Sequence, residues 1–176
     1  MNQQQEDFLA ASALASTMIA TAQRGYLYRK GVSPLARRQF QDALRRALQS
    51  LLPQYKVEVS HEQHCTNIKS VADNLSAVNK DTLADDEFRI GSAQKALNLY
   101  LKFMWCLGRI ERPPHCPFDF RVVSLIPGCK VKWTKLKTLG EYERLVSEAR
   151  RVAGDLSLAD WELVEYQKTM NKQVGK

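Results

Sequence analysis

The chain has 176 residues, of which 44% are hydrophobic, so it is long enough and apolar enough to bury a core. Its 26 lysines and arginines outnumber 19 acidic residues and give a formal net charge of +7. This excess favours an anionic partner, with nucleic acid as the first choice and a membrane surface as the second. No segment reaches the ~18–20 uninterrupted apolar residues of a membrane span. We therefore expect no membrane-embedded segment.

The N-terminal apolar run and the cysteines favour a cytoplasmic location. The run over residues 8–22 follows Glu6 and Asp7, whereas an export signal begins with basic residues. The four cysteines have no closely paired spacing, which indicates reduced thiols rather than disulfides. They are Cys65, Cys106, Cys116 and Cys129.

Apolar residues recur at helical spacing along most of the chain, and cap or stop residues bound each stretch. Gly25 ends the first helix, and the second runs from Ser33-Pro34 to Pro53. Capping boxes begin three later helices, at Ser60 with Gln63, Thr138 with Glu141, and Ser157 with Asp160. The remaining predicted helices cover residues 92–107 and 118–126, and residues 55–59 are expected to form an extended connector.

These elements predict an all-α fold: a single domain over residues 1–176 with about seven helices. Long, proline-rich connections, such as the one with Pro113, Pro114 and Pro117, favour an irregular arrangement over a simple bundle. The aromatic helix 158–170 is expected to dock on the core or on a second subunit. It could thereby support a homodimer or bind another protein.

Basic residues gather in two strips, over residues 29–46 and 121–137. Such strips can bind nucleic-acid phosphates, and Trp133 in the second could stack on a base. The alternative is a solvated helix face and a basic loop with no ligand. The candidate nucleic-acid-binding residues are Arg37, Arg38, Arg45, Arg121, Lys130, Lys132, Trp133 and Lys135.

The segment 88–128 carries the densest set of candidate site residues. Within it, IGSAQKALNLYL and CPFDFRVVSLI resemble the hairpin and the aspartate segment of the helix-hairpin-helix superfamily of DNA glycosylases. The resemblance implies that Gly91 and Ser92 offer backbone amides to a DNA phosphate. It also implies that Lys95 attacks the sugar C1′ with assistance from Asp119. Lys95 and Asp119 are 24 positions apart, more than is usual in that superfamily.

Two plainer interpretations of these residues stay open. Lys95 could be an exposed lysine at the start of a helix, and Asp119 could be the N-cap of the helix that follows Pro117.

The histidines and two cysteines form a second constellation. His61, His64, Cys65, His115 and Cys116 have the chemical types that zinc prefers and could together supply four ligands, with His61, His64, His115 and Cys116 as the candidate set. Adjacent residues such as His115 and Cys116 seldom bind one ion together. The alternative is that the cysteines are small buried apolar residues and the histidines are polar or capping groups. We expect no metal and no cofactor.

The sequence contains no phosphate-binding loop, GxGxxG, HExxH or Cys-x-x-Cys motif. Our main functional hypothesis is a nucleic-acid-binding helical protein, with DNA as the expected partner and glycosylase or lyase chemistry as an extension. The alternative is a non-enzymatic interaction module of a defence or mobile-element system, whose basic surface meets an acidic protein.

Overall fold

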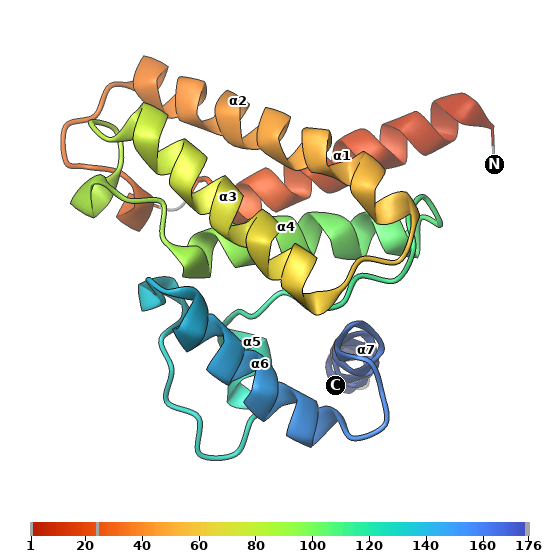
Figure 1. Cartoon of the computed structure of the whole chain (residues 1–176). Coiled ribbons are helices and arrows are strands. Elements are labelled where there is room, and N and C mark those ends of the chain that lie inside the picture. The colour runs from red at the N-terminus through yellow and green to blue at the C-terminus, as the bar shows by residue number, and fades with distance from the viewer. Residues whose placement is uncertain (1, 24, 175–176) are drawn as a thin grey trace.

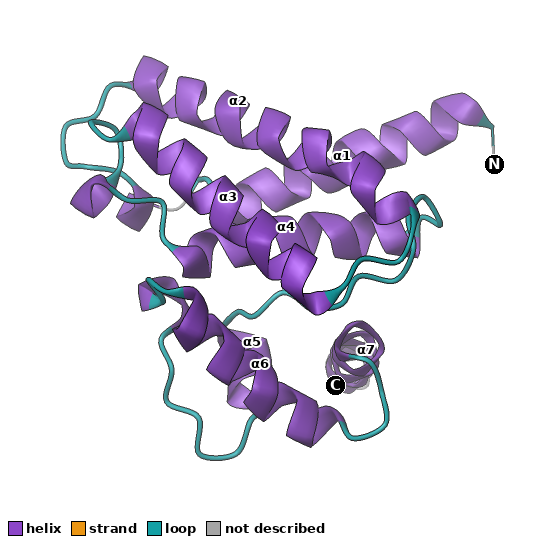
Figure 2. Cartoon of the chain, viewed as in Figure 1, coloured by secondary structure: helices purple, strands orange, loops and turns teal. Residues whose placement is uncertain are grey.

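The computed structural model describes residues 2–23 and 25–174, and within these ranges the secondary structure is helical without strands (Figure 2). One isolated bridge joins Tyr28 to Leu83. The described residues form seven α-helices, as expected: α1 (Gln3–Thr21), α2 (Pro34–Leu51), α3 (His61–Asn79), α4 (Ile90–Cys106), α5 (Phe120–Ser124), α6 (Leu139–Ala153) and α7 (Leu158–Val174). Short 3₁₀ turns lie between them: η1 (Gly25–Leu27), η2 (Leu52–Lys56), η3 (Ala84–Asp86) and η4 (Trp133–Lys135).

The helices begin where the capping signals place them. The Ser33 side chain caps α2, whose first residue is Pro34, and Ser60 caps α3. Thr138 and Glu141 complete a reciprocal capping box at α6. These caps satisfy amide groups that the first helical turn leaves without partners.

The expected extended connector at residues 55–59 is wrong in its first part. Tyr55 and Lys56 belong to the 3₁₀ turn η2, and the extended backbone begins at Val57. The Tyr55 ring is 1% exposed and its hydroxyl contacts the ring of His64. Burial of this side chain therefore favours a compact turn over an extended segment.

Helix α4 is the centre of the fold. It packs against α1, α2, α3, α6 and η4, and most of its side chains, polar ones included, are buried. Figure 1 shows α1 to α4 grouped on one side and α5, α6 and α7 on the other. The core therefore continues from Phe40 on α2 through Leu97 on α4 to Tyr142 on α6.

The C-terminal helix α7 docks on its own chain. Leu158, Ala159 and Trp161 are buried, whereas Val164 and Tyr166 are each 39% exposed. Half-buried Lys102 of α4 pairs with buried Glu162 of α7 at 2.6 Å and helps to hold the helix. None of the described helices is long and apolar enough to cross a membrane.

Candidate functional site

The structure brings Lys95 and Asp119 together. The Nζ of Lys95 lies 3.8 Å from the Oδ2 of Asp119. Lys95 is the sixth residue of α4 and is only 7% exposed, so it is not an exposed lysine at the start of a helix. The Asp119 side chain is 36% exposed, which leaves this end of the pair accessible to solvent.

Asp119 is also the N-cap of α5. Its Oδ1 accepts hydrogen bonds from the amides of Arg121 at 2.9 Å and Val122 at 3.3 Å. The capping interpretation is therefore correct, and the same carboxylate also lies beside Lys95, because its two oxygens have different partners. Capping fixes the orientation of the carboxylate that faces Lys95.

Gln94 fixes the segment before Asp119 to α4. Its Oε1 accepts from the amide of Phe118 at 3.1 Å, and its Nε2 donates to the carbonyl of Phe118 at 2.6 Å. Gln94 is fully buried and directly precedes Lys95. These two bonds therefore set the spacing between the helix that carries the lysine and the turn that carries the aspartate.

Trp133 covers the lysine. The Nζ of Lys95 lies 4.6 Å from the centre of the Trp133 ring, within the range of a cation–π contact. Trp133 is half-buried against the core. One ring face is therefore engaged inside the protein, which limits the stacking on a base that we expected.

The backbone at Gly91 and Ser92 already has partners inside the protein. The Gly91 amide donates to the Leu136 carbonyl at 3.0 Å, and the Ser92 amide donates to the Arg89 carbonyl at 2.9 Å. Both residues are buried within the first turn of α4. A Cβ added at Gly91 would lie 1.7 Å from the carbonyl oxygen of Trp133. The close approach of η4 explains this glycine, and the expected amide contacts with a phosphate are incompatible with this conformation.

The two basic strips lie on different parts of the molecule. Figure 1 places α2 at one edge and the connection from α5 to α6 at the opposite edge, with α3 and α4 between them. On α2, Arg45 pairs with Asp42 at 2.6 Å and Arg37 lies over the ring of Tyr28, while Arg38 is exposed.

The second strip borders the Lys95–Asp119 pair. Arg121 of α5 lies over the ring of Tyr166 at 5.1 Å, and Lys132 and Lys135 flank Trp133 in the sequence. Lys130, Lys132 and Lys135 are exposed, and none of them forms an ion pair with a described carboxylate. This second strip is the more available anion-binding surface.

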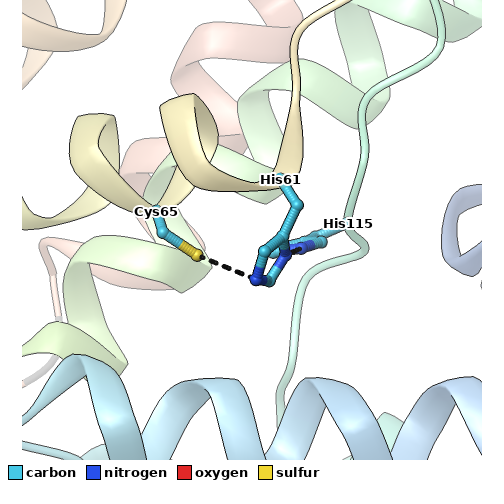
Figure 3. Close-up of side chains that lie close together, drawn as sticks. All are labelled: His61, Cys65 and His115. Atoms are coloured by element: carbon cyan, nitrogen blue, oxygen red, sulfur yellow. Dashed lines mark hydrogen bonds between the residues drawn. The ribbon is translucent and has the colours of Figure 1, made fainter.

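A separate polar cluster forms where α3, α6 and the connection from α4 to α5 meet. Figure 3 shows His61 and Cys65 on successive turns of α3, with His115 approaching from the connection. The Nδ1 of His61 lies 2.8 Å from the Nε2 of His115. The Nε2 of His61 lies 3.9 Å from the Sγ of Cys65. One donor atom from each of these residues lies within 4.8 Å of the other two.

His64 is a core residue with both ring nitrogens engaged. Its Nε2 contacts the Oδ1 of Asn98 and its Nδ1 contacts the hydroxyl of Tyr55, each at 2.8 Å. The orientation of Asn98 is set by Gln94, whose Oε1 accepts from the Asn98 amide. His64 therefore carries its hydrogen on Nε2 and accepts from Tyr55. Burial lowers the pKa of His64 to about 3, so the ring is neutral.

The structure groups only two residues of the candidate set of zinc ligands, His61 and His115, with Cys65. His64 has no free nitrogen, and Cys116, at 1% exposure, lies outside the group of possible ligands. Cys65 takes the place of these residues beside His61 and His115. Burial raises the pKa of the Cys65 thiol to about 11. The i, i+4 spacing of His61 and Cys65 on one helix face was the sequence signal for this pairing.

No known protein family, curated protein or solved structure matches this chain.

Proposed function

We propose that this protein binds DNA and acts on it as a glycosylase or lyase, with Lys95 as the amine nucleophile and Asp119 as its partner. The observation that carries the proposal is the 3.8 Å approach of the Lys95 ammonium to the Asp119 carboxylate. Lys95 and Asp119, the two residues that the family resemblance implies, thus lie close together, and the lysine side chain is buried. Burial away from water is one of the features by which catalytic lysines are activated.

The proposed chemistry is addition of an amine to a sugar aldehyde. The ammonium of Lys95 first gives a proton to the adjacent carboxylate of Asp119. The neutral amine then attacks the C1′ aldehyde of an abasic nucleotide, and the new C–N bond gives a carbinolamine. Asp119 returns its proton to the carbinolamine hydroxyl, which leaves as water, and the carboxylate is ionised again. The product is a cationic Schiff base, which the ionised carboxylate of Asp119 stabilises by its charge.

The basic strip beside the pair supplies the binding energy in this proposal. Arg121, Lys130, Lys132 and Lys135 neutralise backbone phosphates and bring the extruded nucleotide toward Asp119. Gly91, Ser92 and the α2 arginines do not belong to the proposed surface. We also propose a cytoplasmic location, because all four cysteines, which lie among the described residues, are unpaired.

The proposal is tested by reduction of the Schiff base. Borohydride should fix the protein covalently to DNA that contains an abasic site, and Lys95→Gln should abolish this product. The matched control is Lys69→Gln, which alters an exposed lysine on α3 and should leave trapping intact. Retardation of DNA without trapping would leave only a binding function. Absence of retardation at low salt would reject the DNA proposal and favour an acidic protein partner.

A further inference from the structure

We propose that His61, Cys65 and His115 form a zinc site that ties α3 to the segment leading into Asp119. The donors are two imidazoles and one thiol, a combination typical of tetrahedral Zn²⁺ in proteins. Two of the three residues are buried and His61 is partly exposed, so an ion could enter from the His61 side. The site uses none of the atoms assigned to chemistry on DNA.

The distances between donors suit a tetrahedral ion after a small adjustment. Donor atoms around zinc lie about 3.3–3.8 Å apart, given Zn–N bonds of about 2.0–2.1 Å and Zn–S bonds of about 2.3 Å. The separation of Cys65 Sγ from His61 Nε2 is 3.9 Å, close to this range. The 2.8 Å contact between His61 Nδ1 and His115 Nε2 is a hydrogen bond, which must break when an ion binds the Nε2 of His115. The His61 side chain is 29% exposed and can rotate to make room.

Helix α6 supplies a candidate fourth ligand. The Oε1 of Glu143 lies 3.8 Å from the Nε2 of His61, the nitrogen that also faces Cys65. The Glu143 carboxylate would be the fourth ligand of Zn²⁺. Together with the Cys65 thiolate, it would balance the two positive charges of the ion. The site would then join three parts of the chain that are distant in sequence: α3, the connection from α4 to α5, and α6.

A hydrogen-bonded outer shell holds His115 in place for ligation. Its Nδ1 lies 2.7 Å from the hydroxyl of Tyr142, which also accepts from the amide of Asn98 at 3.1 Å. When Nε2 binds a metal, Nδ1 carries the ring hydrogen and donates it to this hydroxyl. Ligating histidines commonly have such a partner, because it fixes both the ring and its tautomer.

The zinc site would act as a structural clamp. His115 precedes Asp119 by one short turn of chain, and Gln94 already fixes Phe118 between them. An ion at His115 would therefore hold the Asp119 segment from its other end. Because it rests on different side chains, this inference stands whether or not Lys95 reacts with DNA.

Cobalt substitution tests the site directly. Untagged protein, stripped with a chelator, is titrated with Co²⁺ and monitored by absorption. We expect saturation at one ion per chain, visible bands of tetrahedral Co²⁺ and a thiolate-to-cobalt charge-transfer band. Added Zn²⁺ should displace the cobalt and raise the melting temperature of the stripped protein by several degrees.

Two variants and a matched control locate the ligands. Cys65→Ser should abolish the charge-transfer band, and His61→Ala should weaken zinc binding at least about tenfold, a typical loss for a disrupted site. Cys106→Ser changes an exposed thiol outside the cluster and should keep the band. A stripped protein that neither develops the bands nor gains stability with zinc overturns the proposal. Bands that survive in Cys65→Ser would also overturn it.

Discussion

The carboxylate of Asp119 serves two partners at once: its Oδ2 lies 3.8 Å from the Nζ of Lys95, and its Oδ1 caps helix α5. The carboxylate that faces the lysine is thus held in place by hydrogen bonds from the first amides of α5. Charge and cap can be separated experimentally, because asparagine is about as good an N-cap as aspartate but carries no charge.

Replacement of Asp119 should separate these two roles. Both variants lose the ion pair with Lys95, but Asp119→Asn keeps the cap, so Asp119→Ala should be less stable than Asp119→Asn by about 1 kcal/mol. Both variants should slow Schiff-base formation on the order of 10²-fold, since both lack the proton acceptor. Urea unfolding and the rate of trapping measure the two effects. An Asn variant that traps at the normal rate would remove Asp119 from the chemistry.

Gly91 and Gly140 are a natural pair for testing the contact between η4 and α4. Each is the second residue of its helix, but a Cβ on Gly91 would meet the Trp133 carbonyl at 1.7 Å, while one on Gly140 has nothing within 4 Å. Gly91→Ala should cost roughly 3 kcal/mol or more, because η4 must move. Gly140→Ala should gain about 0.5–1 kcal/mol. Similar effects in the two variants would contradict the close approach.

Glu162 should make stability depend on pH. Burial raises the pKa of this carboxyl above its ordinary value of 4.5, against the opposing effect of Lys102. Since the folded state keeps the proton longer than the unfolded state, the contribution of Glu162 to stability is greatest below pH 4.5 and is lost as the pH rises through the folded pKa.

Comparison with Glu162→Gln isolates this contribution. The stability of the variant relative to the wild type should increase as the pH rises above 4.5, by at most about 1.4 kcal/mol per unit of pH. Urea unfolding across this range measures the difference. Glu165→Gln removes a carboxylate paired with Lys168 at the surface of the same helix, and it should change stability by less than ~1 kcal/mol. A constant difference between wild type and Glu162→Gln would show that the carboxyl is ionised throughout.

The salt dependence of DNA binding should distinguish the two basic strips. Lys132→Gln and Lys135→Gln should each lower the slope of log K against log salt by about 0.9, the value for one lost phosphate contact. Arg38→Gln on α2 should leave the slope unchanged, because α2 lies at the opposite edge of the molecule (Figure 1). Equal losses in all three variants would mean that net charge alone drives binding.

Local signals predicted most of the helices correctly. Ser33-Pro34 and the box formed by Thr138 and Glu141 begin helices because the responsible contacts lie within one turn of the chain. The proximity of Lys95 to Asp119 followed from the order of motifs in the family resemblance. It could not have been derived from helical periodicity.

The remaining features depend on contacts between distant segments. His61 and His115 are 54 positions apart, and only the packing of α3 against the proline-rich connection brings them together. Trp133 covers Lys95 from a turn whose position no local pattern encodes. Gly91 resembled a phosphate-binding glycine, whereas its lack of a side chain serves the contact with η4.

The position of the covalent bond after borohydride trapping decides whether Lys95 is the nucleophile. The wild-type protein is reduced on DNA that contains an abasic site, the product is digested with protease and nuclease, and the modified peptide is identified by mass spectrometry. We expect one nucleotide remnant per chain, attached to the Nζ of Lys95. A remnant on the N-terminal amine or on an exposed lysine such as Lys132, or no remnant on a protein that binds this DNA, would contradict it.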